Sequence, residues 1–362
     1  MGRSVVGLDI GTSGIRAAEI KLGGRMPVLR RFASAPLPAG ALHGGGVVEP
    51  AVVAQALKEL WAKARFSTNV VTFGIANEGI LVRQMDLDWM PPADFRKAIR
   101  YQVADALPVP VEEANLDYCV LGETELPGQQ GGETRRMVRI LLVAAGREVV
   151  DGFVAAVQQA GLRPNRADLV PFALIRLTNP DLVDDAPLEA IIDIGADTVS
   201  VTVHSGGYPR FVRMVPGQGS NNITRALQER YNWTWDEAER TKIALGLPTA
   251  DDQLTDDQSG DDHPAQQLIA KLTGTLIGEL RTTLDFFGSS GTDPQQISRI
   301  LLTGSGSRLG GLTARLANEL GLPVEQLPPL AGLRKRRRVR LDDEALTRLA
   351  ASAGLCLGAA ER

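Results

Sequence analysis

Residues 5–20 read VVGLDIGTSGIRAAEI, and this stretch governs how the rest of the chain is interpreted. An apolar run ends at Asp9, two glycines mark a tight turn, and a second apolar run leaves through Ile15. Glycine lets backbone N–H groups come close to a phosphate, and Thr12 and Ser13 add hydroxyl donors. A carboxylate beside a phosphate requires a cation between them. Taken alone, the stretch fits either a plain β-hairpin or a β-hairpin that holds a phosphate and a metal ion.

The same pattern returns later in the sequence. Residues 190–203 read AIIDIGADTVSVTV, with Asp193 in the place of Asp9, and residues 300–307 read ILLTGSGS. Single glycine turns of this kind occur in many sheets, so the spacing of all three turns is the specific signal. Two similar hairpins indicate two similar half-molecules that face one nucleotide, each with a phosphate turn and a carboxylate near the metal.

This order of turns resembles the actin-like ATPase superfamily, which has two phosphate loops followed by an adenosine loop. The resemblance implies an α/β fold of two lobes, each with a mixed sheet and helices, around Mg-ATP. It implies that Asp9 and Asp193 act on the hydrated metal and that Asp9 also orients a water molecule. The residues expected to contact the nucleotide are Gly11, Thr12, Ser13, Gly195, Asp197, Gly217, Gly219, Glu239, Lys242, Gly304, Gly306 and Ser307.

Two parts of this site have alternative interpretations. The superfamily places a glycine pair before a helix, but here Gln218 separates Gly217 from Gly219, so either glycine could approach the nucleotide. Glu239 and Lys242 lie three residues apart on a predicted helix and share one face. The resemblance places them at the ribose and the adenine, whereas their spacing alone equally fits an exposed ion pair.

Residues 85–162 depart from the usual actin-like pattern. We expect a helix from Pro91 to Leu107, strands at 116–121 and 138–145, and a helix at about 149–160. This unit resembles the inserted domain of the type IV pilus assembly PilM family, which is related to the division protein FtsA. The motifs that carry the resemblance are MPP (90–92), LPVP (107–110), LDY (116–118) and AGL (160–162).

The chain is accordingly divided into three units. The first actin-like lobe comprises residues 1–84, 163–187 and 343–362, the inserted α+β subdomain of the SHS2 type comprises 85–162, and the second lobe comprises 188–342. Small residues in the last helix, among them Ala353 and Gly354, predict a close crossing of helices between the lobes.

The family resemblance implies a cytoplasmic ATP-binding adaptor of a type IV pilus or related secretion complex. Its partner would be the short N-terminal segment of a PilN-like inner-membrane protein, which would hold the adaptor at the inner face of the membrane. Superfamily hydrolases position the attacking water with Glu or Gln, and in the segment 168–173 that place falls to Val170. We therefore expect ATP to be bound tightly, hydrolysed slowly or not at all, and used as a conformational ligand.

Two other functions remain open. A filament-forming cytoskeletal ATPase of the FtsA or MreB type shares the fold and would sediment in a concentration-dependent way. A sugar-kinase-type phosphotransferase shares the phosphate hairpins, but it needs a general-base Asp between the lobes. The sequence offers no clear candidate for that base, and the insert fits a kinase poorly.

The composition of the 362-residue chain sets further limits. Its net charge of −4 gives no reason to expect nucleic acid, and no uncharged apolar run approaches the roughly 20 residues that cross a bilayer. Cys119 and Cys356 lie in apolar stretches without metal-ligand spacing and are expected to be core thiols. The basic run 334–340, RKRRRVR, fits either a solvated loop or a contact with anionic lipid or an acidic partner.

Overall fold

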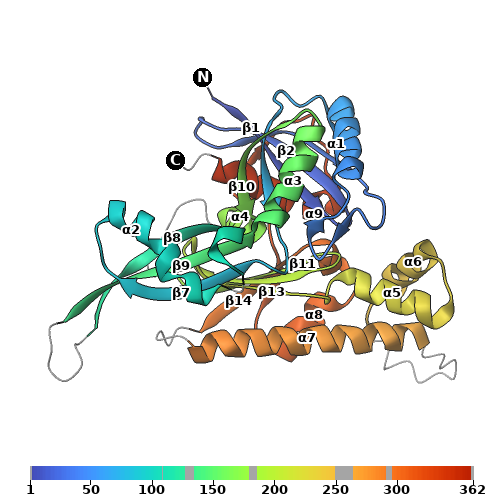
Figure 1. Ribbon diagram of the computed structural model, residues 1–362. Coiled ribbons are helices and arrows are strands. Elements are labelled where there is room, and N and C mark those ends of the chain that lie inside the picture. Colours follow the sequence, from blue (N-terminus) through green and yellow to red (C-terminus); the bar gives the residue numbers. More distant parts are fainter. Residues whose placement is uncertain are drawn as a thin grey trace.

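A computed structural model describes residues 2–107, 109–126, 134–178, 186–248, 264–290 and 296–359. Two mixed sheets with their helices form two lobes, and a smaller sheet lies beside them (Figure 1). This is the α/β architecture with duplicated lobes and an insert that the sequence predicts.

The first lobe contains a six-stranded sheet in the order β10-β6-β1-β2-β3-β16. The expected hairpin is formed by β1 and β2, and Asp9 pairs across it with Arg16. The strands are β1 (Ser4–Gly11), β2 (Gly14–Lys21), β3 (Val28–Ala35), β6 (Val70–Ile75), β10 (Arg163–Leu169) and β16 (Arg334–Lys335), with a small separate pair, β4 (Leu42–His43) and β5 (Gly46–Val47).

The second lobe repeats this arrangement in a five-stranded sheet of order β13-β12-β11-β14-β15. In both lobes the first strand begins a three-stranded antiparallel meander on one side and has parallel strands on the other. The shared topology confirms the duplication predicted from the two hairpins. The strands are β11 (Leu188–Ile194), β12 (Val199–Ser205), β13 (Tyr208–Val215), β14 (Ile297–Thr303) and β15 (Val324–Gln326).

Helices cover both sheets. The long helix α7 runs along the base of the second lobe, with α5 and α6 at one end of it, while α1 and α3 lie together on the first lobe (Figure 1). The helices are α1 (Pro50–Ala64), α3 (Arg147–Gln159), α4 (Val170–Thr178), α5 (Ser220–Tyr231), α6 (Trp235–Leu245), α7 (Pro264–Ser290), α8 (Leu312–Leu320) and α9 (Asp343–Gly358).

The insert is a three-stranded antiparallel sheet, β7-β9-β8, with one face covered by α2. Its core contains Phe95 and Ile99 from α2, and Ile140 and Leu142 from β9. Its elements are β7 (Leu81–Asp88), α2 (Pro92–Gln102), β8 (Ala114–Leu126) and β9 (Arg135–Gly146). Two short turns of 3-10 helix, Ala104–Ala106 and Val111–Glu113, lie between α2 and β8.

Three details of the insert differ from the expectation. The helix expected to reach Leu107 ends at Gln102, and Leu107 is extended (φ −91°, ψ 143°) because a residue before proline is pushed out of the helical region. The strand expected at 116–121 is longer at both ends. Cys119 is exposed on β8, an edge strand, whereas Cys356 is buried as expected.

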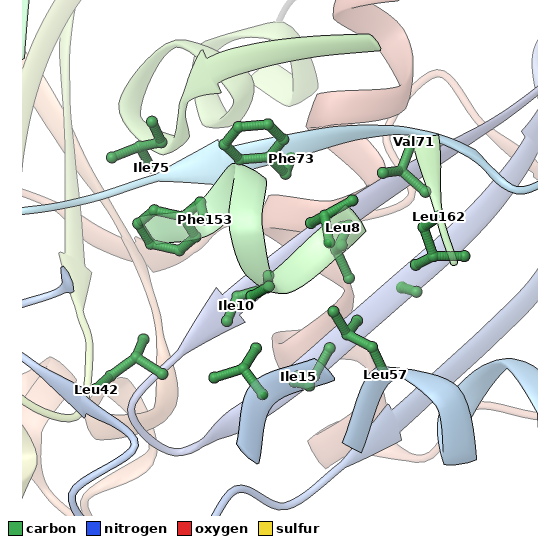
Figure 2. Packing of buried hydrophobic residues seen from close by; sticks show 14 of the residues in the cluster. Leu8, Ile10, Ile15, Leu42, Leu57, Val71, Phe73, Ile75, Phe153 and Leu162 are labelled. Carbon is green, nitrogen blue, oxygen red and sulfur yellow. The ribbon is translucent and has the colours of Figure 1, made fainter. Parts of the chain in front are cut away.

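The helix α3, which the sequence assigned to the insert, packs on the first lobe. Phe153 is fully buried and stacks on Phe73 of β6 at a centroid distance of 5.9 Å. Figure 2 shows Phe153 beside Phe73 and Ile75, in the same cluster as Leu8 and Leu57. We therefore propose that the insert spans residues 81–146 rather than 85–162.

The helices α4 and α9 pack against each other between the lobes. Their apolar side chains share one core with residues of both sheets, including Ile20 of β2 and Ile191 of β11. The two helices are so close at this point that a Cβ on Gly354 would lie 2.0 Å from the carbonyl oxygen of Ala173. The predicted close crossing at small residues is thus confirmed, and α4 and α9 connect the two lobes.

The described residues contain no helix that is both long enough and apolar enough to cross a bilayer. The basic run is only partly a loop, because Arg334 and Lys335 form β16 beside β3.

Replacement of Gly354 by alanine is predicted to push α9 away from α4. An added methyl group in a packed core typically costs about 1–3 kcal/mol, and here it meets backbone rather than a flexible side chain. Urea unfolding of the full chain measures the loss. The matched control is Gly278→Ala in α7, where a Cβ has no neighbour within 4 Å. Equal stability of the two variants would contradict the close crossing.

Candidate functional site

The three glycine turns meet around one inner cavity of about 100 Å³. The β1–β2 turn comes from the first lobe, and the β11–β12 turn and the end of β14 come from the second. The predicted site residues that line this cavity are Asp9, Gly11, Thr12, Ser13, Asp193, Gly195, Asp197 and Gly304. Three turns that lie far apart in the sequence thus line a single cavity, as the spacing of the three motifs indicates.

A larger outer cavity of about 300 Å³ adjoins the inner one, and Ser305, Thr347 and Arg348 line both. This volume lies at the lower end of the usual range for small-molecule sites, about 300–1,000 Å³. The predicted site residues in its wall are Gly219, Glu239, Lys242 and Gly306. The two cavities form one elongated site with a polar inner end and a roomier outer end.

Two predicted residues lie outside both cavity walls. Gly217 is exposed, with a left-handed φ of 67°, and Gly219 lines the outer cavity instead. Ser307 is 2% exposed, and its Oγ donates to the carbonyl oxygen of Gly304 over 2.7 Å. This hydrogen bond from Ser307 therefore stabilises the conformation of the third glycine turn from outside the cavity walls.

An arginine that the sequence analysis overlooked lies inside the inner cavity. Arg16 Nη1 is 3.3 Å from Asp9 Oδ2 and donates to the carbonyl oxygen of Gly14 over 3.2 Å, while its Nη2 donates to Ser13 Oγ. Its position follows from the hairpin register, because Arg16 stands directly opposite Asp9. That register was available in the sequence, so alternation along the second strand would have identified this cation.

Asp9 and Asp193 line the inner cavity from opposite lobes. Of the cations in its described wall, Arg16 pairs with Asp9, whereas Arg348 pairs with Glu344. Burial raises the pKa of Asp9, and the Arg16 guanidinium opposes this rise. Burial, with the nearby Asp9 charge adding to it, raises the pKa of Asp193 to about 7. Two buried carboxylates in this arrangement favour either a proton or a metal ion.

The donor set fits Mg²⁺ bound together with a phosphate. Magnesium is usually held by one or two carboxylates plus phosphate and water oxygens, which Asp9 and Asp193 can satisfy. No group of three or more His, Cys, Asp or Glu side chains that could hold a metal ion occurs in the described part of the chain. Ser200 lies opposite Asp193 in the inner cavity, and its buried Oγ has no partner among the described residues. A polar ligand would supply that partner.

The β11–β12 turn is hydrogen-bonded to the start of α5. The N–H groups of Ser220 and Asn221 donate to the carbonyl oxygens of Gly195 and Ala196 over 2.9 and 2.8 Å. Asp197 Oδ1 accepts from Arg225 over 2.8 Å. These N–H groups are therefore used within the protein, and the expected attraction of an anion by this helix end is reduced.

Gly219 and Gly304 are required by this close packing. A Cβ on Gly219 would lie 2.2 Å from the carbonyl oxygen of Ala196, and one on Gly304 would lie 2.3 Å from Asp193 Oδ1. Gly304 also has a left-handed φ of 88°. Any side chain there would displace the carboxylate of Asp193, so the third turn fixes the position of the second-lobe acid.

Glu239 and Lys242 form an ion pair in which Lys242 is buried and the Glu239 side chain is 35% exposed, rather than a fully exposed pair. Lys242 is 5% exposed, and its Nζ donates to Glu239 Oε2, Thr224 Oγ1 and the carbonyl oxygen of Ser220 over 2.7, 2.9 and 3.3 Å. Burial lowers the pKa of Lys242, and Glu239 opposes that change. All three ammonium donors are used, so Lys242 could contact a base only by giving up one of these bonds.

The carboxylates in the described lining of the inner cavity belong to Asp9, Asp193 and Asp197. Val170 lines it at the start of α4, and its described lining residues include no glutamate, glutamine or histidine. Nearby Asp168 is 9% exposed and its Oδ2 accepts from Arg176 over 2.8 Å. The carboxylate of Asp168 is therefore held in an ion pair with Arg176, and Asp168 is not among the described lining residues of the inner cavity.

Replacement of Asp193 by asparagine is predicted to stabilise the nucleotide-free protein at alkaline pH. The folded-state pKa of about 7 exceeds the ordinary value of 3.8, so the folded state binds this proton more tightly than the unfolded state. Its contribution to stability is complete below pH 4 and is lost as the pH rises through 7. The wild type should lose roughly 1–3 kcal/mol more stability than Asp193→Asn between pH 5 and pH 8.

Urea unfolding at the two pH values measures this difference. The control is Asp285→Asn, which removes an exposed carboxylate from α7. Parallel pH profiles for the wild type and Asp193→Asn would contradict a raised pKa at Asp193.

Comparison with known proteins relates this arrangement to solved structures. A PilM-PilN type IV pilus biogenesis complex is similar with a TM-score of 0.82 and 28% identity over 99% of both chains. The ethanolamine utilization protein EutJ from Carboxydothermus hydrogenoformans has a TM-score of 0.51 and 15% identity, covering 98% of this chain and 89% of EutJ. MreB5 of Spiroplasma citri bound to ADP has a TM-score of 0.51 and 11% identity, covering 97% and 94%. The last two likenesses concern the fold alone.

A family model provides the assignment. The model described as type IV pilus assembly protein PilM matches residues 7–362, which include both hairpin turns, the insert and the third glycine turn. The chain therefore belongs to the type IV pilus assembly protein PilM family.

Proposed function

We propose that the chain is an ATP-binding adaptor of a type IV pilus assembly complex at the inner face of the cytoplasmic membrane. Its partner is the cytoplasmic N-terminal segment of a PilN-like membrane protein. The observation that carries this proposal is the likeness to a PilM-PilN complex along 99% of both chains, insert included. The adjoining cavities between the lobes support the nucleotide part of the proposal.

In this proposal the inner cavity receives the phosphates and the outer cavity receives the nucleoside. Thr12 and Ser13 donate from the first turn, and Arg16 offsets the phosphate charge. Asp9 and Asp193 would hold Mg²⁺ or its water ligands, and the ion would supply positive charge between carboxylates and phosphates. Gly306 lets the third turn pack closely against Ile194 in the wall of the outer cavity, since a Cβ there would lie 2.4 Å from Ile194 Cγ2.

Nucleotide serves as a conformational ligand in this account. Val170 cannot position or deprotonate water, and Asp168 is paired with Arg176. Hydrolysis is therefore expected to be slow compared with binding. Bound ATP contacts both lobes, so it favours the arrangement in which the two turns are close, and any partner that prefers that arrangement binds differently.

The insert is connected to this equilibrium by contacts on both lobes. Its strand β7 packs against β13 at the edge of the second lobe, and β9 continues directly into α3 on the first lobe. A change in the angle between the lobes would therefore alter the surroundings of the insert. A groove beside the insert is where we place the PilN-like segment.

Titration of the full chain with the N-terminal peptide of the PilN-like protein tests both parts. The wild type should bind the peptide, and Mg-ATP should change its Kd by about 5–150-fold, the range of typical coupling free energies. Gly306→Ala displaces Ile194 in the wall of the outer cavity, so it should bind peptide without responding to ATP. Gly288→Ala, at a position where a Cβ has no neighbour within 4 Å, is the matched control and should respond like the wild type.

Absence of peptide binding would exclude the adaptor function. Peptide binding that is identical with and without Mg-ATP, while ATP itself binds, would exclude nucleotide as the conformational ligand and leave the adaptor function standing.

A further inference from the structure

The basic run 334–340 has a fixed backbone. The N–H of Arg334 donates to the carbonyl oxygen of Pro27 over 2.9 Å, and the N–H of Arg336 donates to that of Leu29 over 3.1 Å. A turn closes between Val339 N and Arg336 O over 3.0 Å. These bonds add the run to the edge of the first sheet beside β3.

Apolar residues on both sides of the run anchor it further. Leu333 is 8% exposed, and Val339 and Leu341 pack on the core between the lobes. The charged side chains between these anchors face solvent. The exposed cations are Arg334, Lys335, Arg336, Arg337, Arg338 and Arg340.

These six cations have no ion pair among the described residues. The acids that follow them are largely engaged, because Asp342 Oδ1 accepts from the N–H of Ala345 and Glu344 pairs with Arg348. Asp343 is the remaining exposed acid at the start of α9. A chain with a net charge of −4 therefore concentrates uncompensated positive charge at one sheet edge.

The neighbouring hairpin end extends this positive area. Lys21 pairs with Val28, which pairs in turn with Arg334, so the three lie in one row across adjacent strands. Arg25 is exposed in the β2–β3 turn, and Met26 beside it is 40% exposed. We call Lys21, Arg25 and Met26, together with the six cations of the run, the basic edge.

We propose that the basic edge docks on the anionic headgroups of a phospholipid bilayer. The exposed cations of the basic edge have no ion-pair partner among the described residues, and the backbone of the run is hydrogen-bonded to the sheet. Such a cluster of positive charge can bind an extended negatively charged surface without a pocket of complementary shape. An exposed methionine beside them suits the boundary between headgroups and acyl chains. Each cation near an anionic membrane strengthens binding about fivefold. This contact is independent of the PilN-like partner and of nucleotide, and it would orient the first lobe towards the membrane.

Vesicle co-sedimentation of the full chain, without nucleotide or partner, tests the proposal. The wild type should bind vesicles made of an equimolar mixture of phosphatidylcholine and phosphatidylglycerol, and not vesicles of phosphatidylcholine alone. Binding should weaken as salt is added. Loss of three charges in R336Q/R337Q/R338Q should reduce binding on the order of 100-fold.

The matched control removes three exposed cations of the second lobe, R210Q/R230Q/K271Q, and gives the same net charge. It should bind anionic vesicles nearly as the wild type does. Equal losses in both triple variants, or no binding of the wild type to anionic vesicles, would overturn the proposal. Binding of polyglutamate but not of vesicles would also overturn it and would assign the basic edge to an acidic protein partner.

Discussion

Two carboxylates on different lobes, Asp9 and Asp193, set the constraint on which this molecule depends. Each ends the first strand of its sheet, and the duplicated topology brings both to one inner cavity. The two negative charges repel each other, so a close approach of the lobes is favoured when a metal ion, a proton or the Arg16 guanidinium offsets that charge. Burial is the main cause of the raised pKa of Asp193, and the charge of Asp9 adds to it. A ligand that brings its own cation relieves the repulsion and joins the lobes.

The rest of the fold makes this local balance matter elsewhere. The helices α4 and α9 share a core with both sheets, α4 begins at the inner cavity with Val170, and α9 contributes Thr347 and Arg348 to both cavities. The insert contacts the second lobe through β7 and the first through its connection to α3. A change at the cavities therefore has a packed route to the insert, which is where family resemblance and physical contact both direct the search for a partner segment.

Sequence alone predicted the duplicated fold because the hairpin motif carries its own topology: apolar strand, acid, glycine turn, strand. Most of the site residues predicted from the sequence line the two cavities, although which of those residues contact a nucleotide stays a prediction. The turn motif does not reveal Arg16, because this residue reaches the cavity through its pairing opposite Asp9 in the β1–β2 hairpin. The saturated ammonium of Lys242 and the engaged N–H groups of Ser220 and Asn221 depend on how separate segments pack, which no local pattern encodes.

Electron paramagnetic resonance of Mn²⁺ in place of Mg²⁺ tests the central claim most directly. The account predicts that the full chain binds one Mn²⁺ only together with ATP. Asp9→Asn and Asp193→Asn should each weaken this binding at least ~10-fold, equivalent to ~1.4 kcal/mol, while Asp285→Asn should leave it unchanged. Tight Mn-ATP binding that persists in both site variants would show that the two carboxylates do not serve the metal and would contradict the account.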